Sequence, residues 1–169
     1  QIKEELRNEI VNLKERGLEP CLAVVLVGED PASAVYVRNK KRTCEELGIR
    51  SVGHDIPETT SQNELENLVN DLNNDPSVHG ILNQFPLPNG LDESRVIRKI
   101  SPEKDVDGLN PLNAGLIAMG QPSFISCTPY GVLQMLKRSN ISTSGKNAVV
   151  LGRSNLVGRP IATLLSSKG

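Results

Sequence analysis

Aromatic residues are almost absent from this chain of 169 residues, which has no Trp and only two Tyr and two Phe. Its net charge is −1, and acidic and basic residues are interspersed rather than gathered in blocks. Proteins that bind nucleic acid commonly need a basic stripe and aromatic side chains on which bases stack. Because the sequence has neither feature, we expect no nucleic-acid partner.

Long apolar runs and metal-type cysteine spacings are also missing. The longest apolar run, Cys21–Val27, is far shorter than the roughly 20 residues that a membrane-spanning helix needs. The three cysteines, Cys21, Cys44 and Cys127, are scattered and lack metal-ligand spacing. We therefore expect no membrane partner and no metal site. Unpaired cysteines are typical of a cytoplasmic protein or, alternatively, a protein of the mitochondrial matrix.

Helical and strand patterns alternate along the chain. Hydrophobic spacing predicts helices near 2–16, 31–47, 62–74, 92–99, 112–119, 129–138 and from about 157, and strands at 22–28, 49–56, 78–82 and 147–151. This alternation is typical of an α/β fold with βαβ units and a mostly parallel sheet. The length allows one domain and part of another. We expect a first domain over 1–125 and the beginning of a second over 126–169.

Both ends of the chain adjoin predicted helices. Gln1, which is not a methionine, opens a helix that is already under way, and Gly169 directly follows an apolar helix. We expect the sequence to be a piece of a longer protein.

Three polar side chains share one face of the helix predicted after the first strand. Ser33, Tyr36 and Lys40 are three and four residues apart, and residues at these spacings are neighbours on a helix surface. Asp30 and Pro31 are typical of an N-cap and a first helical residue. Since ligands of parallel sheets bind beyond the carboxyl ends of the strands, this face is a candidate site. A solvated Ser and Lys beside an edge-packed Tyr is the alternative.

Two further segments place polar side chains after the third predicted strand. Gln84 comes directly before a Pro-Leu-Pro sequence, and its amide can accept from a Lys ammonium while donating to a ligand. Taken alone, such a Gln is more typical of a turn. Asp105 and Asp107 lack the further oxygen ligands of a Ca²⁺ loop. They indicate either a turn in which Asp bonds its own backbone or a carboxylate directed at the N–H groups of a heterocycle.

The last motif lies between the strand predicted at 147–151 and the final helix. It comprises Gly152, Arg153, Ser154 and Gly158. Glycine lets the backbone approach a phosphate closely, a helix N-terminus attracts anions, and Arg suits bidentate phosphate contacts. The motif is not the complete dinucleotide fingerprint, so an ordinary strand-to-helix turn with a solvated Arg is the alternative.

Taken together and in this order, these segments resemble the bifunctional methylenetetrahydrofolate dehydrogenase/methenyltetrahydrofolate cyclohydrolase family. The matching motifs are Ser-x-x-Tyr-x-x-x-Lys at 33–40, Gln-x-Pro-Leu-Pro at 84–88, Pro-x-Lys-Asp-Val-Asp-Gly at 102–108, Cys-Thr-Pro-x-Gly at 127–131 and Gly-Arg-Ser-x-x-Val-Gly-x-Pro at 152–160. The resemblance covers essentially the whole chain.

Some residues depart from the family pattern. Asn83 and Phe85 flank Gln84 where aliphatic residues are usual, Asn110 stands where His is common, and Ser126 stands where Pro is common. None of these changes removes a reacting group. Asn83, however, can shift the packing of Gln84.

The resemblance implies both a fold and a function. The fold is an N-terminal three-layer αβα catalytic domain that binds folate, followed by the start of a Rossmann-type NAD(P)-binding domain. The reactions are oxidation of 5,10-methylenetetrahydrofolate with NADP⁺ (alternatively NAD⁺) and hydrolysis of 5,10-methenyltetrahydrofolate to 10-formyltetrahydrofolate. The resemblance also implies a homodimer for the full-length protein.

The resemblance further implies roles for individual residues of the folate site. The catalytic residues would be Lys40, Gln84 and Asp107. Lys40 would serve as the acid/base group of the hydrolysis, and Gln84 would position its amine without adding a negative charge. Asp107 would bind the N–H groups of the pterin. Tyr36 would stack on the aromatic ring of the folate, and Ser33 would cap or orient.

Residues of the second domain would complete the site. Pro129 would contact the substrate, and the dinucleotide would be bound by Gly152, Arg153, Ser154 and Gly158. Hydride transfer mainly requires that the nicotinamide and the folate carbon lie side by side, so the protein would supply position.

Two other functions compete with this interpretation. Tyr36-x-x-x-Lys40 also resembles the catalytic pair of short-chain dehydrogenases, but that family needs a Gly-rich turn before the Tyr. Here such a turn lies after it, at Gly152. The second alternative is an inactive or binding-only chain, because only part of a dinucleotide domain is expected. A rise in melting temperature with folate would reveal binding, since a ligand that binds only the native state stabilises it.

Overall fold

The computed structural model describes residues 2–167, so Gln1 and Gly169, where we expect the chain to be cut, lie outside the described residues. By its internal contacts the chain divides into two compact units, 1–100 and 101–169. The predicted domain boundary at 125/126 falls inside the second unit, because the helix that begins at Pro111 packs against the last helix of the chain.

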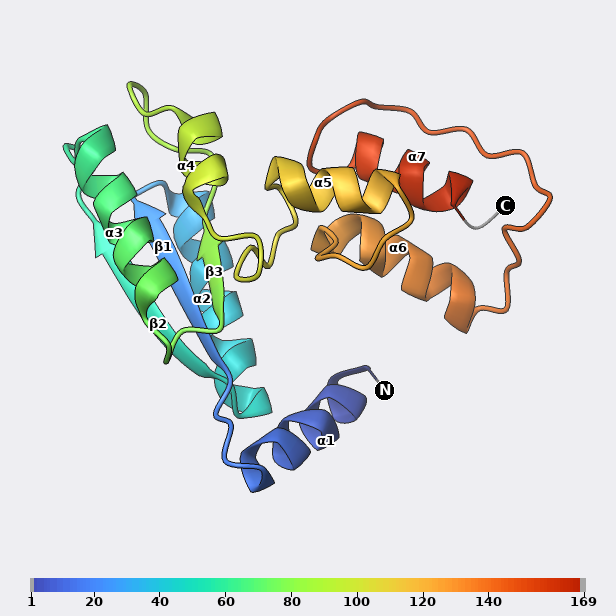
Figure 1. Cartoon of the computed structure of the whole chain (residues 1–169), viewed down its shortest axis with the longest axis horizontal. Helices are drawn as coiled ribbons and strands as arrows, with labels where there is room; N and C mark the ends of the chain where they lie inside the picture. The colour runs from blue at the N-terminus through green and yellow to red at the C-terminus, as the bar shows by residue number, and fades with distance from the viewer. Residues whose placement is uncertain (1, 168–169) are drawn as a thin grey trace. The chain divides into compact units, whose positions relative to one another are not determined.

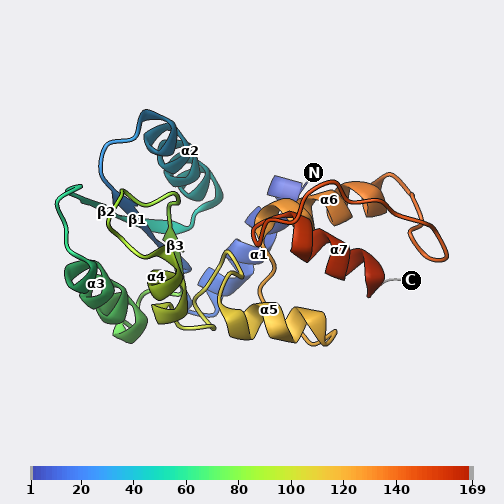
Figure 2. The ribbon, with the colours of Figure 1, turned by 90° about the horizontal axis from the view of Figure 1, so that it is seen from above.

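The first unit is built on a three-stranded sheet. Its elements are, in order, α1 (Ile2–Glu15), β1 (Cys21–Val27), α2 (Pro31–Leu47), β2 (Arg50–Ile56), α3 (Gln62–Asn74), β3 (Gly80–Asn83) and α4 (Glu93–Lys99). The strand order is β2-β1-β3, and β1 pairs in parallel with both neighbours. Helix α2 covers one face of the sheet, while α3 and α4 cover the other (Figures 1 and 2). The predicted three-layer αβα arrangement is therefore confirmed.

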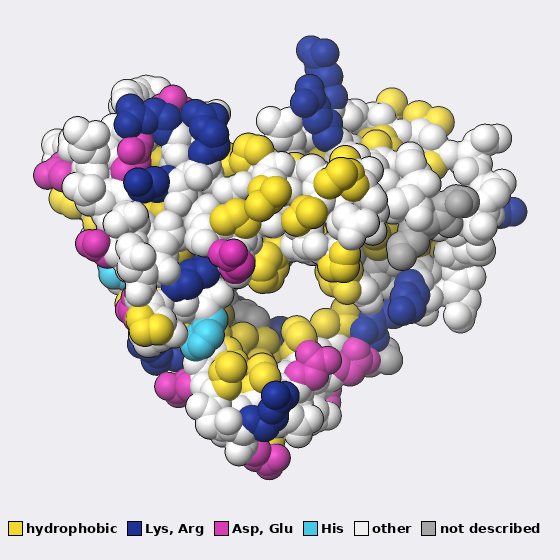
Figure 3. Space-filling model, viewed as in Figure 1, with side chains coloured by type: hydrophobic (Ala, Val, Ile, Leu, Met, Phe, Trp, Pro, Cys, Tyr) yellow, Lys and Arg dark blue, Asp and Glu magenta, His cyan; other side chains and the backbone are white. Residues whose placement is uncertain are grey.

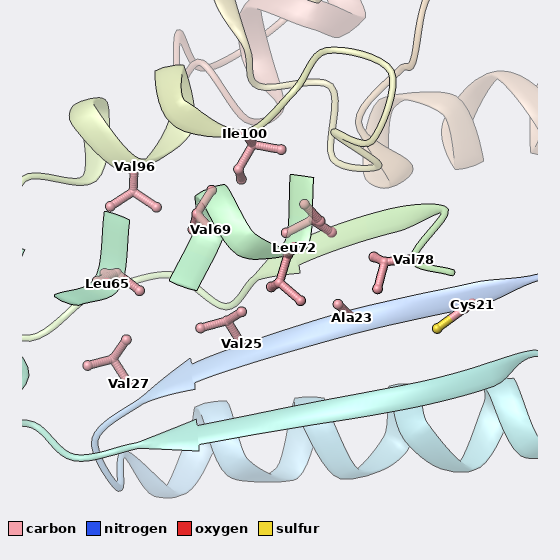
Figure 4. Close-up of a cluster of buried hydrophobic side chains, with 11 residues drawn as sticks. Cys21, Ala23, Val25, Val27, Leu65, Val69, Leu72, Val78, Val96 and Ile100 are labelled. Carbon is pink, nitrogen blue, oxygen red and sulfur yellow. The ribbon is translucent and has the colours of Figure 1, made fainter. Parts of the chain in front are cut away.

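Strand β1 is buried on both faces of the sheet. A parallel strand between two helical layers contacts apolar groups on each side, which explains its unbroken apolar sequence. Alternate residues of β1 point toward α3 and α4, as Figure 4 shows for Ala23, Val25 and Val27. The same cluster contains Cys21, Leu65, Val69, Leu72, Val78, Ile81, Val96 and Ile100. Burial of this apolar surface, worth roughly 25 cal/mol per Å², holds the layers together.

The register of the sheet fixes which residues lie at its carboxyl edge. Val25 of β1 stands opposite Asn83 of β3, and the backbone N–H of Gln84 donates to the Val25 carbonyl at 2.9 Å. On the other side of β1, the Gly28 N–H donates to the Ile56 carbonyl at 2.9 Å. The loop that follows each strand therefore begins at one common edge of the sheet.

Helix α2 begins and ends as its sequence predicts. The Asp30 carboxylate accepts from the Ser33 backbone N–H at 2.7 Å, and Pro31 is the first helical residue. Gly48 ends the helix in the left-handed conformation, with φ of 83°, and its N–H bonds the carbonyls of Cys44 and Glu45. These end signals fix the position of α2 along the sheet.

The second unit is made of helices and connecting segments. Helix α7 (Gly158–Ser166) contacts both α5 (Pro111–Ala118) and α6 (Cys127–Arg138). Apolar side chains lie at the surface over α5, where Leu112 is 56 % exposed and Met119, just after the helix, is 68 % exposed (Figure 3). Across residues 2–167 no helix is long and apolar enough to cross a membrane.

The strand predicted at 147–151 does not form, and that prediction is wrong for this chain. These residues belong to a connecting segment between α6 and α7 (Figure 1), and Val149 and Leu151 are 86 % and 96 % exposed. A strand needs a neighbour for its backbone N–H and C=O groups. Between residues 101 and 167 the structure has no other strand to pair with it.

The cap of α2 makes the stability of the first unit depend on pH. Hydrogen bonds from the backbone N–H and the side chain of Ser33 hold the pKa of Asp30 below its ordinary value. Since the depressed pKa belongs to the folded state, the carboxylate stabilises the fold above its unfolded-state pKa of about 3.9. This contribution is lost as the pH falls through the folded-state pKa.

We therefore expect Asp30→Ala to lower the urea midpoint of unfolding at pH 7. The difference from the natural chain should shrink as the pH falls below about 3.9 and through the depressed folded-state pKa of Asp30, where the natural carboxylate takes up a proton. Urea titrations at a series of pH values measure this. A midpoint difference of equal size at every pH would contradict the charged cap.

Candidate active site

Helix α2 and the end of β3 bring Lys40 and Gln84 together. The Lys40 amine donates to Gln84 Oε1 at 3.1 Å, and both side chains are partly buried. At the other end of the amide, Gln84 Nε2 donates to the Phe85 carbonyl at 2.8 Å. Because a carbonyl only accepts, this second bond turns the amide oxygen of Gln84 toward the amine. Two residues 44 positions apart thus form one polar pair.

The alternation of β3 explains why Gln84 meets α2. Ile81 belongs to the core cluster on the α3 and α4 face, so Asn83, two residues later, lies on that face as well. Gln84 is the next residue and turns to the opposite face, which α2 covers. Lys40 lies on α2. The pairing therefore follows from the register of β3 and the position of α2.

Ser33 and Tyr36 have different surroundings on the same helix. Ser33 is only 4 % exposed and bonds the Asp30 carboxylate, so it supports the start of α2. Tyr36 lies one turn before Lys40 and is 62 % exposed, which leaves its ring accessible to a ligand. Lys41, next to Lys40, points elsewhere: its amine lies 3.5 Å from the Asp55 carboxylate on β2.

The structure separates the two carboxylates of the Asp-x-Asp segment. Asp105 is only 2 % exposed, and its Oδ2 accepts from the Asn110 backbone N–H at 2.7 Å and from Asn113 Nδ2 at 2.9 Å. Asp105 is thus the turn carboxylate, and Asp107 is the more accessible of the pair. The sequence predicted a turn role or a ligand role for Asp105 and Asp107 without dividing the roles between them, and it gave no role to Asn113. The Asn-Pro sequence at 110–111, typical of a helix start, is the signal that could have indicated a structured turn here.

The Gly152–Gly158 turn folds back onto the start of α7. Ser154 Oγ accepts from the backbone N–H groups of Val157 at 3.1 Å and Gly158 at 3.3 Å, so Ser154 caps two of the free amides at this helix start. A Cβ on Gly158 would lie 2.5 Å from the Gly152 carbonyl oxygen, so only glycine fits there. Arg153 and Ser154 are exposed. The Ser154 hydroxyl can still donate its own hydrogen to an anion.

The remaining predicted residues are placed as follows. Pro129, a predicted substrate contact, is fully buried within the second unit. Within residues 2–167 none of the three cysteines forms a disulfide; Cys21 and Cys44 are buried and Cys127 is exposed. The pKa of both buried thiols is raised above its ordinary value, mainly because burial disfavours the charged thiolate. Within residues 2–167 no group of three or more His, Cys, Asp and Glu side chains is placed to hold a metal ion.

Comparison with known proteins places these residues in a family. Residues 1–107 match the model of the tetrahydrofolate dehydrogenase/cyclohydrolase catalytic domain. The chain belongs to the tetrahydrofolate dehydrogenase/cyclohydrolase family. Residues 126–169 match the model of the NAD(P)-binding domain of the same family. The family predicted from the sequence is thus confirmed.

Individual members of the tetrahydrofolate dehydrogenase/cyclohydrolase family are closely similar to this chain. The bifunctional protein FolD of Caldicellulosiruptor saccharolyticus is 59 % identical over 168 residues, which cover 98 % of this chain. The structure of FolD from Campylobacter jejuni is 48 % identical, covers 99 % of this chain and has a TM-score of 0.98. The Trypanosoma brucei dehydrogenase-cyclohydrolase, solved with NADP and an inhibitor, is 36 % identical over 99 % of this chain, with a TM-score of 0.93.

The chain is shorter than these family members. It spans 60 % of the C. saccharolyticus protein and of the C. jejuni structure, and 58 % of the T. brucei structure.

The close approach at Gly158 gives a test of the turn. We expect Gly158→Ala to destabilise the chain by about 1–3 kcal/mol, because the added Cβ collides with backbone atoms that cannot move aside cheaply. Gly131, inside α6 with nothing within 4 Å of an added Cβ, is the matched control. Gly131→Ala should be neutral or stabilising by up to about 1 kcal/mol. Denaturant midpoints measure both, and equal effects would show that the turn is not tightly packed.

Proposed function

We propose that this chain contributes the folate site of an enzyme that oxidises 5,10-methylenetetrahydrofolate with NADP⁺ and hydrolyses 5,10-methenyltetrahydrofolate to 10-formyltetrahydrofolate. The Lys40–Gln84 pair carries the proposal, because it places an amine at the carboxyl edge of a parallel sheet. The match of residues 1–107 to the catalytic domain supports it. The proposed division into a folate domain, 1–125, and the start of a NAD(P)-binding domain, 126–169, agrees with where the second family match begins.

In the proposed hydrolysis, water adds to the methenyl carbon, a proton leaves that water, and one carbon–nitrogen bond breaks to give the formyl group. Lys40 is the group that takes up and returns the proton. Its amine carries N–H in both protonation states, so it can keep its hydrogen bond to Gln84 Oε1 throughout. The Phe85 carbonyl prevents the Gln84 amide from flipping, and so keeps the amine in one place.

The proposed folate contacts come from residues with suitable exposure. Tyr36 presents an accessible ring, which suits stacking on the aromatic ring of the folate. Asp107 is more exposed than Asp105, and its carboxylate suits the N–H groups of the pterin. We propose Pro129 only as a residue that shapes the second unit, because its side chain is buried.

The residues at the start of α7 fit a dinucleotide phosphate. An exposed Arg153, a Ser154 hydroxyl that can donate, and the close turn at Gly152 and Gly158 form a small donor set at a helix N-terminus. NADP, when bound, accepts the hydride from the folate carbon, and these residues would hold its phosphates. The T. brucei relative solved with NADP supports NADP, and the NAD-dependent relative from Saccharomyces cerevisiae makes NAD the alternative. Parallel assays with NADP⁺ and NAD⁺ decide between them.

Location and assembly are also part of the proposal. We place the protein in the cytoplasm, as the bacterial FolD relatives suggest, and expect a homodimer when the protein is full length. Light scattering of the purified protein measures its mass directly.

A binding-only chain is the second candidate function. It is favoured by one observation: the segment 147–151 is not part of a sheet here, so this chain on its own lacks a formed dinucleotide domain core. Folate binding without turnover is the behaviour this candidate predicts.

We expect Lys40→Ala to lower hydrolysis of 5,10-methenyltetrahydrofolate by 10²- to 10⁴-fold, roughly the contribution of a positioned acid/base group. Folate affinity should change little. Lys41→Ala is the matched control, because the neighbouring amine faces Asp55 instead of Gln84. Loss of methenyl absorbance measures the rate. Normal turnover by Lys40→Ala would contradict the assignment, whereas a folded natural chain that binds folate without turnover would support the binding-only function.

Substitution of the two carboxylates should have different consequences. We expect Asp107→Ala to weaken folate binding by roughly ten- to a hundred-fold, since it removes a charge-assisted hydrogen bond. Asp105→Ala should instead lower the melting temperature, because the buried Asn113 amide and Asn110 N–H lose their acceptor. Calorimetric titration with folate and thermal unfolding measure the two effects. A fully retained affinity in Asp107→Ala would remove Asp107 from the site.

A further inference from the structure

Asn83 is a polar residue buried in an apolar part of the first unit. Its side chain is 2 % exposed, and neither Oδ1 nor Nδ2 has a hydrogen-bond partner among residues 2–167. It stands opposite Val25 and shares the face of Ile81, both of which belong to the core cluster. A buried amide left without partners disfavours the folded arrangement by roughly ten- to a hundred-fold in population.

Because of the position of Asn83, its unpartnered amide destabilises mainly the carboxyl end of β3. Asn83 is the last residue of β3, which has four residues where β1 and β2 each have seven. The next residue, Gln84, makes the outermost backbone bond to β1, from its N–H to the Val25 carbonyl. Beyond it, the chain is held to α4 through the Leu87 N–H, which donates to Glu93 Oε1 at 2.8 Å. The unpartnered amide therefore sits at the end of a short strand, where pairing can be broken without unfolding the sheet.

We propose that the carboxyl end of β3 opens locally in solution and that Asn83 is the positioning residue that sets how often it opens. In the open state water reaches both amide atoms, so the cost of burying them is relieved there and not in the closed state. An apolar side chain in this place gains nothing from opening. Since Gln84 moves with the strand end, each opening separates its amide from the Lys40 amine.

Ligand binding can change the population of this open state. A ligand that contacts Gln84 in the closed state binds that state alone and therefore lowers the open population. Asn83 lies on the face of the sheet that α3 and α4 cover, opposite the face of α2 and Lys40, and so acts through the backbone of Gln84.

Amide hydrogen exchange followed by NMR tests the proposal on the natural chain, Asn83→Val and Asn83→Leu. The Gln84 N–H reports the strand end, and N–H groups in the middle of β1 report unfolding of the whole sheet. We expect both variants to slow Gln84 exchange by about ten-fold or more relative to the β1 amides. Two substitutions are used because Leu has the branched shape of the amide and Val has the smaller volume.

Two outcomes would overturn the proposal. Equal slowing at Gln84 and in β1 would mean that the amide is released only by global unfolding. Faster exchange at Gln84, or a lower denaturant midpoint in both variants, would mean that Asn83 has a stabilising partner in solution.

A second experiment rests on the proposed function. It distinguishes a wrong folate site from a wrong role for Asn83. With 5-formyltetrahydrofolate as the probe, Gln84 exchange in the natural chain should slow, because a folate bound at Lys40 and Gln84 stabilises the closed strand end. If the apolar variants slow the exchange and the folate does not, the opening stands and the proposed folate site is wrong. If the folate slows the exchange and the variants do not, the site stands and the role of Asn83 is wrong.

Discussion

The burial of β1 between two layers of helices is the constraint on which the rest of the first unit depends. Because β1 is apolar on both faces, it is stable only when α2 covers one side and α3 and α4 cover the other. Its pairing with β3 then places Gln84 at the edge of the sheet beyond Val25. With α2 fixed at its start by Asp30 and at its end by Gly48, Lys40 comes within hydrogen-bond distance of Gln84.

Asn83 shows that this core does not maximise stability at every position. An apolar residue would fill the place opposite Val25 without an unpartnered amide, since Val25 and Ile81 on the same face are both apolar. Proteins carry such local costs most often near functional sites, where some freedom of movement is useful. The cost lies one residue from Gln84, which accepts the hydrogen bond of the proposed acid/base group.

The second unit depends on the packing of three helices, not on a sheet. Helix α7 rests against α5 and α6, and its start is closed by Ser154 and by the tight approach of Gly152 to Gly158. This turn has the donors that a phosphate needs, although the segment before it forms no strand. The turn that we propose to hold a dinucleotide phosphate therefore forms, among residues 101–167, without the sheet on which such sites usually rest.

The sequence by itself determined the elements of the first unit, the caps of α2, the family motifs and the residues worth testing, because these depend on neighbours within about four positions along the chain. Only the tertiary structure decided three other matters. It turned the Gln84 amide oxygen toward Lys40, through the Phe85 carbonyl. It made Asp105 the structural carboxylate, through amide donors that lie five and eight residues later in the chain. It left 147–151 unpaired, since a strand requires a partner strand that local sequence cannot supply.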